Sequence, residues 1–144
     1  MFTQPCFIKK NTPELRKKLE ELGYEYHGQD TSYGTPCNLY CSFGSYFELS
    51  GTSKPSRFES VIDCGTNEEL FLALASLRND SNENQWFIAQ RTMWDENYNG
   101  EITVYYEEGE WLLWDYYSFM EDMPSDFRKA TVEELIEHFK KSKL

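Results

Sequence analysis

The chain is 144 residues long, which is enough for one domain with a hydrophobic core. Its formal net charge is −11, and 17% of its residues are aromatic. An acidic field of this size repels nucleic acid and anionic membranes, so neither is an expected partner. No segment is long and apolar enough to span a membrane, and the first residues lack a signal-peptide pattern, which together predict a cytoplasmic protein.

A strand and a helix are predicted near the N-terminus. The strand covers residues 6–10. Thr12 suits the N-cap of the helix, and Pro13 fits its first turn, where a missing N–H leaves no hydrogen bond unmade. Leucines at 15, 19 and 22 then give one apolar stripe, and Gly23 is expected to end the helix.

Two further strands form a predicted hairpin. They cover residues 38–42 and 46–50, after a shorter strand fragment at 24–26. Gly44 and Ser45 lie between the two strands, and glycine at the first central position of a turn favours type II′.

Residues 60–79 are expected to form the centre of the fold. Val61 and Ile62 predict a short strand. Thr66 and Glu69 are spaced as a capping box at the start of a helix. The helix that follows has more apolar side chains than one face can hold, so we expect it to be covered on most sides.

Three strands of an antiparallel meander are predicted next, at residues 85–91, 101–107 and 110–117. Asn99-Gly100 and Glu108-Gly109 are the expected turns. If Glu108-Gly109 is a two-residue hairpin loop, the last two strands pair and have two aromatic faces. One face holds Ile102, Val104, Tyr106, Trp111 and Leu113; the other holds Thr103, Tyr105, Leu112, Trp114 and Tyr116.

A last helix is predicted to start at Thr131, with Glu134 three residues later as in a capping box. The resulting fold class is α+β. A mostly antiparallel sheet, made of a hairpin plus a three-stranded meander, packs with three helices in a single domain over residues 1–144.

Two short segments suggest a biological setting. The sequences CGTNEELFLALASLRND and FRKATVEELIEHFKK resemble segments of small uncharacterised proteins from prophages and mobile elements. The resemblance implies an accessory or inhibitory protein, and it carries no catalytic motif.

The four cysteines are candidate metal ligands and candidate nucleophiles. Cys37 and Cys41 lie roughly 13 Å apart on a regular strand, which is too far to share one zinc ion, so no metal or other cofactor is predicted. Cys64 lies just before a helix N-terminus, where the helix dipole can lower the pKa of a thiol. A small enzyme with its site at Asp63 and Cys64 is therefore one alternative.

The acidic residues concentrate where the tryptophans do. Residues 80–126 contain twelve acidic side chains and a single basic one, Arg91. Aromatic side chains with an acidic rim suit the docking of a basic protein partner, so a non-enzymatic binding protein is the leading hypothesis. A structural or oligomerising module is the third hypothesis, because an exposed sheet edge can self-associate. The predicted partner-binding residues are Trp94, Tyr105, Glu107, Glu110, Trp114 and Tyr116.

Overall fold

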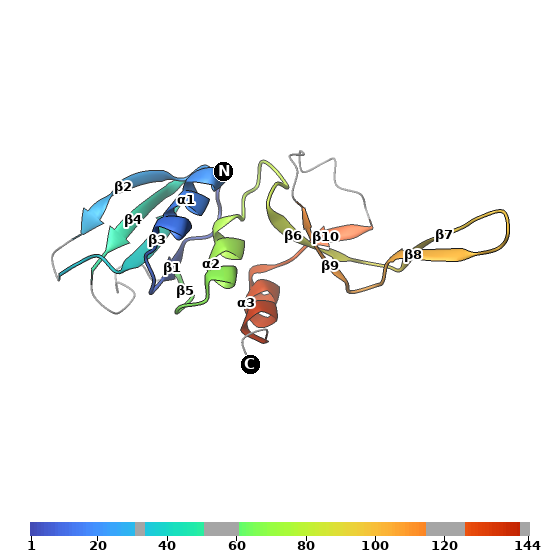
Figure 1. Cartoon of the computed structure of the whole chain (residues 1–144). Coiled ribbons are helices and arrows are strands. Elements are labelled where there is room, and N and C mark those ends of the chain that lie inside the picture. Colours follow the sequence, from blue (N-terminus) through green and yellow to red (C-terminus); the bar gives the residue numbers. More distant parts are fainter. Residues whose placement is uncertain (31–33, 51–60, 115–125, 142–144) are drawn as a thin grey trace. The chain divides into compact units, whose positions relative to one another are not determined.

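The computed structural model describes residues 1–30, 34–50, 61–114 and 126–141. Its contacts divide the chain into two compact units. Unit 1 is formed by Met1–Asn79 and Val132–Leu144, and unit 2 by Asp80–Thr131. The fold class is α+β, as predicted: three helices accompany a mixed five-stranded sheet and small antiparallel sheets (Figure 1). The prediction of a single domain over residues 1–144 remains a prediction.

Unit 1 combines the five-stranded sheet with all three helices. The sheet has the order β2-β4-β3-β1-β5, with parallel β2–β4 and β1–β5 pairs and antiparallel pairs between them. Its elements are β1 (Cys6–Ile8), α1 (Pro13–Leu22), β2 (Glu25–Asp30), β3 (Asn38–Ser42), β4 (Ser45–Leu49), β5 (Ile62–Asp63), α2 (Glu68–Ala75) and α3 (Val132–Lys141).

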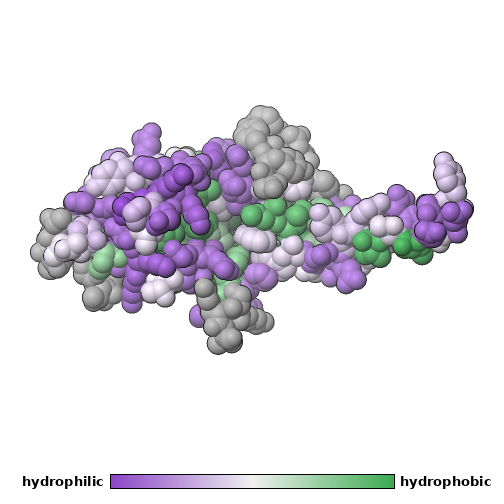
Figure 2. All heavy atoms as spheres, in the orientation of Figure 1, coloured by the Kyte–Doolittle hydropathy of each residue, from purple (hydrophilic) through white to green (hydrophobic). Residues whose placement is uncertain are grey.

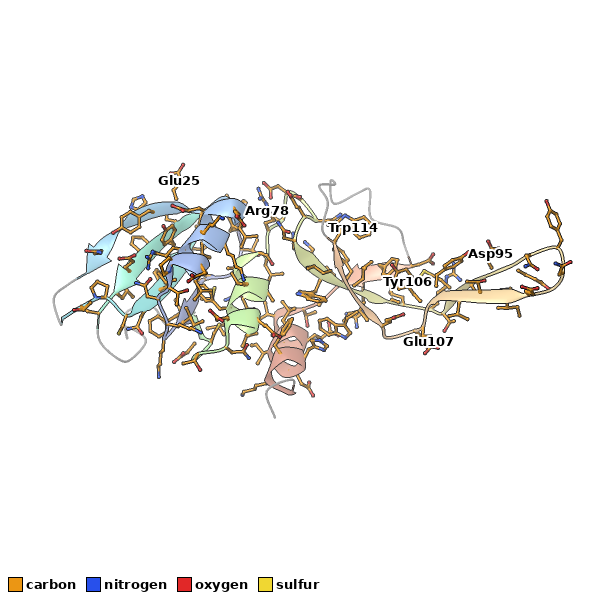
Figure 3. The ribbon with its side chains drawn as sticks, viewed as in Figure 1. Glu25, Arg78, Asp95, Tyr106, Glu107 and Trp114 are labelled. Atoms are coloured by element: carbon orange, nitrogen blue, oxygen red, sulfur yellow. The ribbon has the colours of Figure 1, made fainter. Side chains whose placement is uncertain are left out.

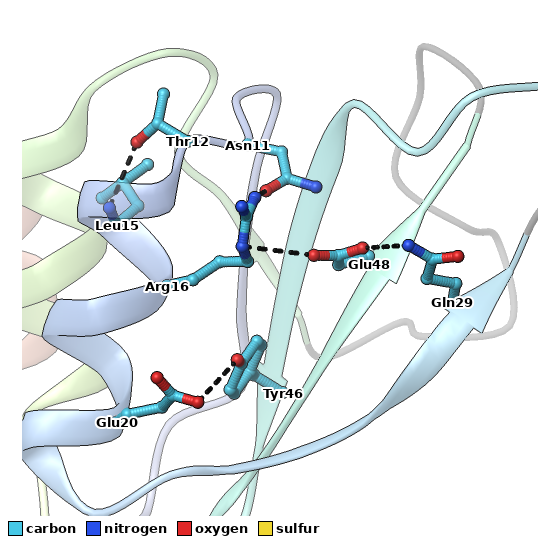
Figure 4. Close-up of polar contacts among 8 residues, drawn as sticks. All are labelled: Asn11, Thr12, Leu15, Arg16, Glu20, Gln29, Tyr46 and Glu48. Carbon is cyan, nitrogen blue, oxygen red and sulfur yellow. Dashed lines mark hydrogen bonds and ion pairs between the residues drawn. The ribbon is translucent and has the colours of Figure 1, made fainter.

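The first helix begins and ends where the sequence predicts. The Thr12 side chain accepts a hydrogen bond from the Leu15 amide, and Gly23 caps the C-terminus with a φ of 111°. One face of α1 lies against β4 through polar contacts (Figure 4). Arg16 pairs with the buried Glu48 carboxylate at 3.4 Å. Below this pair, the Tyr46 hydroxyl donates to Glu20, which gives α1 a second polar attachment to β4.

The β3–β4 hairpin is confirmed, but its turn is one residue earlier than predicted. Ser42 pairs with Ser45, so Phe43 and Gly44 are the two central residues. Both have positive φ, 47° and 92°, which is the pattern of a type I′ turn and not of type II′.

The second helix starts one residue later than predicted. The N-cap is Asn67, whose side chain accepts from the Leu70 amide at 3.1 Å, and not Thr66. The Asn67 amide bonds back to the Cys64 carbonyl, so Thr66 belongs to the preceding turn. The prediction that this helix is covered on most sides is confirmed, because five of its eight residues are buried.

The described residues of unit 2 form strands and turns, with no helix among them. They are β6 (Gln85–Ala89), β7 (Met93–Glu96), β8 (Ile102–Tyr106), β9 (Trp111–Trp114) and β10 (Phe127–Lys129). A three-stranded antiparallel sheet has the order β10-β6-β9, and β7 and β8 form a separate two-stranded sheet. In Figure 1, β7 and β8 continue the course of β6 and β9 beyond β10.

The predicted meander is therefore wrong in its pairing. β8 pairs with β7 and β9 pairs with β6, so Glu108-Gly109 does not close a hairpin. The chain reverses at Asn97–Gly100, so the turn expected at Asn99-Gly100 is confirmed; Gly100 has a φ of 79° and donates its amide to the Asn97 carbonyl. Strand β10 was not predicted; it follows an acidic, proline-containing stretch of sequence.

Candidate functional site

The two-stranded sheet of β7 and β8, with its turn, is here called the ribbon (residues 93–106). Two of its cross-strand pairs, Trp94 with Val104 and Glu96 with Ile102, are separated by the pair Asp95 with Thr103. Directly opposed residues share a face, and faces alternate along a strand. Trp94, Val104, Glu96 and Ile102 therefore occupy one face, which we call the ribbon face.

The ribbon face is apolar and exposed. Trp94 is 56% exposed, Ile102 62% and Val104 49%. In Figure 2, hydrophobic residues are visible on the ribbon beside the hydrophilic residues of its turn. Of the nine large hydrophobic side chains that are exposed in the described parts of the chain, six lie between Trp94 and Leu113. Such a concentration of exposed apolar side chains is typical of an interaction site.

Exposed carboxylates lie on both faces of the ribbon and just after it. Asp95, Glu96 and Glu101 lie on the ribbon, and all three are exposed. Glu107, Glu108 and Glu110 follow directly after β8 and are also exposed. Within the described residues none of these six carboxylates forms an ion pair, and the sequence has no basic residue between Arg91 and Asp126. The ribbon thus combines an apolar face with an uncompensated negative field.

The base of the ribbon is attached to the three-stranded sheet. The Tyr106 ring packs edge-to-face on Phe127 of β10, with the ring centroids 5.2 Å apart. The Glu108 amide, between β8 and β9, donates to the hydroxyl of Thr92, which lies between β6 and β7. This hydrogen bond links the two chain segments at the base of the ribbon. These contacts hold the base of the ribbon, while Tyr98 at its turn is fully exposed.

Four of the six predicted partner-binding residues lie at exposed positions in this region. Trp94 and Tyr105 belong to the ribbon, and the register shift between Met93 and Trp94 leaves Tyr105 without a directly opposed residue. Glu107 and Glu110 lie in the turn between β8 and β9, where the Glu110 carboxylate accepts from the Glu107 amide. Asp95 and Glu107 are labelled in Figure 3.

The other two predicted residues do not join them. Trp114 is only 7% exposed and packs on Phe87 at a centroid distance of 5.8 Å, so its predicted role as an exposed contact is wrong. The reason is the pairing of β9 with β6, which places Trp114 at the far end of β9 from the ribbon (Figure 3). Tyr116 lies outside the described residues.

Sequence reasoning missed Ile102 and Val104 as surface residues. It assigned them to a face shared with Trp111 and Leu113, because it assumed a hairpin at Glu108-Gly109. The usable signal was symmetry: two strand-forming segments of nearly equal length flank Asn99-Gly100, which predicts one long hairpin centred there.

The alternative site at Asp63 and Cys64 has a different character. The Cys64 thiol is buried, and burial raises its pKa, with nearby Cys6 and Asp63 adding to the increase. The direction is opposite to the lowering that a helix N-terminus was expected to cause. The Asp63 carboxylate accepts from the Gly65 amide at 2.8 Å and thereby stabilises the turn before α2.

The described residues also supply no metal centre. They contain no group of three or more His, Cys, Asp and Glu side chains that could hold a metal ion. Cys6 and Cys41 lie opposite each other on β1 and β3 and are both buried, whereas Cys37 is exposed. No helix in the described ranges has the length and apolar character needed to cross a membrane.

Comparison with protein-family models, with curated proteins and with solved structures finds no match. The function must therefore be inferred from the geometry and charge of the chain itself.

Proposed function

We propose that this chain is a non-enzymatic binding protein, an accessory protein of mobile-element type, that docks a basic protein through the ribbon. The exposed ribbon face carries the proposal. Trp94, Ile102 and Val104 offer an apolar centre of the kind that supplies most of the binding energy in interfaces. The carboxylates on the ribbon and just after it favour a partner rich in lysine and arginine, because complementary charge steers association and selects the partner.

The enzyme hypothesis receives no comparable support. A nucleophilic cysteine needs an accessible thiolate and a nearby base. Cys64 is 5% exposed, and burial raises the pKa of its thiol. The ribbon, in contrast, offers several exposed contacts without any rearrangement.

The test is retention of host proteins on the immobilised full-length chain, from a nuclease-treated lysate of the native host, read by mass spectrometry. The variant Ile102→Thr/Val104→Thr keeps β-branched residues in β8 and removes the apolar contacts. Tyr26→Ala changes a similarly exposed side chain in unit 1 and serves as the control. We expect a basic protein that wild type and the control retain, and that the ribbon variant retains about tenfold less, a change of about 1.4 kcal/mol.

A second pair of variants tests the charge. Glu101→Lys/Glu107→Lys reverses two exposed carboxylates at the ends of β8, whereas Glu21→Lys/Glu25→Lys makes the same change in unit 1. Only the first pair is expected to abolish retention, and high salt is expected to weaken retention by wild type. Equal retention by all of these proteins, or recovery of the chain alone, would show that the ribbon is not a docking site.

A further inference from the structure

The outer edge of β8 has unpaired backbone groups at known positions. The Asn97 amide donates to the Glu101 carbonyl at 3.0 Å, so this pair is hydrogen-bonded across the ribbon. Hydrogen-bonded and non-hydrogen-bonded pairs alternate in an antiparallel ladder. Ile102 and Val104, which occupy the non-hydrogen-bonded positions, therefore direct their N–H and C=O groups away from β7. Within the described residues β8 has no second neighbouring strand.

We propose that β8 accepts an extended segment of the basic partner as a third strand, and that this segment has a β-branched or apolar centre between lysine or arginine residues. The proposal rests on the proposed function and specifies how the partner binds. A two-stranded ribbon is marginally stable alone, and a third strand adds backbone hydrogen bonds together with cover for the apolar side chains.

The sequence of β8 dictates the chemistry of the added strand. Ile102, Thr103 and Val104 favour β structure and are apolar or uncharged, so cross-strand packing requires similar residues opposite them. Glu101 precedes this centre and Glu107 follows it, and both are exposed. Basic side chains at both ends of the added strand would lie beside these carboxylates.

The same charges disfavour a second copy of this chain as the occupant. An antiparallel pair of two β8 strands centred on Val104 places Glu101 of each copy opposite Glu107 of the other. A parallel pair places identical glutamates side by side. Like charges directly opposite each other destabilise a strand pair, and charged residues are a common protection of exposed edges. In these two registers the glutamates at the ends of β8 disfavour pairing with a second copy and favour a basic strand.

The experiment uses a blocked peptide, Lys-Lys-Val-Thr-Val-Thr-Lys-Lys, as the probe. Full-length ¹⁵N-labelled protein is titrated with the peptide, and amide hydrogen exchange is measured by NMR. We expect the Ile102 and Val104 amides to exchange about tenfold more slowly in the complex, because both become hydrogen-bonded. The Tyr98 amide, at the turn, is expected to keep its exchange rate.

Two matched peptides separate strand addition from general charge attraction. A peptide with N-methyl groups on its four central residues keeps the charge but cannot form the ladder, so it is expected to give no protection. A peptide with glutamate in place of lysine is expected to bind only the Glu101→Lys/Glu107→Lys variant. Equal binding of the N-methylated peptide, or no protection at Ile102 and Val104 at millimolar peptide, overturns strand addition.

A failure of strand addition can be distinguished from a failure of the proposed docking function. Ribbon-dependent retention of a basic host protein, without protection of the β8 amides by the peptide, would leave docking in place and remove the strand mode. Loss of ribbon-dependent retention would remove the docking function itself, whatever the peptide does. Sedimentation of the free protein tests whether a second copy of this chain pairs along the edge of β8. Self-association through β8 would contradict the choice of a basic partner as the occupant.

Discussion

Trp114 shows how strongly burial decides the role of a single residue. Its ring is 7% exposed and packs on Phe87, so Trp114→Ala is expected to leave a cavity and to lower the free energy of unfolding by about 3–5 kcal/mol. Trp94→Ala, at a 56% exposed position, is expected to change it by less than about 0.5 kcal/mol. Urea denaturation of the two variants measures the difference. Similar losses in the free energy of unfolding would show that Trp114 is not more buried than Trp94.

The cysteines differ in accessibility in the same way. Cys37 is exposed, while Cys64 is buried and its pKa is raised by burial. Because alkylation needs an accessible thiolate, iodoacetamide at neutral pH is expected to modify Cys37 first and to leave Cys64 intact in the folded protein. Peptide mapping over time gives both rates. Modification of Cys64 as fast as Cys37 would revive the enzyme hypothesis.

Lys129 gives unit 2 a pH dependence of stability. Burial lowers the pKa of Lys129 to about 8, and Asp80 only partly offsets this effect. An unfolded lysine has a pKa of about 10.4, so between these pH values the unfolded chain binds more protons and this residue makes stability rise with pH. Lys129→Met is therefore expected to stabilise the protein at pH 7 and to lose this advantage by about pH 10.5.

The control for that change is Lys140→Met, because Lys140 is exposed on α3. Chemical denaturation between pH 7 and 10.5 compares the two variants with wild type. A stabilisation by Lys129→Met that is constant across this range would reflect hydrophobic gain alone and would contradict the proposed titration.

At the scale of elements, polar contacts link α1 to β4. The Glu48 side chain is 10% exposed; its carboxylate pairs with Arg16 at 3.4 Å and accepts a hydrogen bond from the Gln29 side-chain Nε2 at 2.8 Å. Arg16 also donates to Asn11. Glu48→Gln keeps the shape but removes the charge that Arg16 requires, so we expect a loss of about 1–3 kcal/mol in the free energy of unfolding.

The matched control is Glu68→Gln, which removes an ion pair between Glu68 and Lys10 whose side chains are both 42% exposed. Exposed pairs contribute little, so a change below about 0.5 kcal/mol is expected. Equal effects of the two substitutions in thermal unfolding would show that the Glu48 contacts do not stabilise the attachment of α1.

Local signals predicted the elements better than their pairing. Thr12, Pro13 and Gly23 determine the ends of α1 through their own backbone and side chains, and these were predicted correctly. The cap of α2 was misplaced by one residue, because Thr66 and Asn67 are both good caps and the preceding turn decides between them.

The candidate site was predicted only in part for a related reason. Which strand pairs with β8 depends on contacts between residues far apart in the sequence, and both Asn99-Gly100 and Glu108-Gly109 have the composition of a turn. The acidic and aromatic character of the region was visible, and so were Trp94 and Glu107. The exposure of Ile102 and the burial of Trp114 follow from the strand pairing, which the composition of the two turns alone does not determine.

At the scale of the whole molecule, charge divides unevenly between the two units. Asp80–Thr131 carries twelve acidic and three basic side chains, a net of −9, which leaves −2 for unit 1. Self-repulsion of this kind destabilises a compact state and is screened by salt. Raising NaCl from about 0.01 M to about 0.5 M is therefore expected to slow hydrogen exchange of the Phe87 amide more than that of Leu74. An equal change in the exchange rates of both amides would argue against electrostatic self-repulsion that is confined to unit 2.

The chain enters unit 2 after α2 and returns to unit 1 at α3, which packs against α2. Unit 1 is thus completed by a segment that is synthesised after all of unit 2. During synthesis, all of unit 2 emerges from the ribosome before α3 does. The side chains of α2 that contact α3 therefore stay uncovered until α3 has been made. A ribbon already folded at that stage would be available to the proposed partner before unit 1 has finished folding.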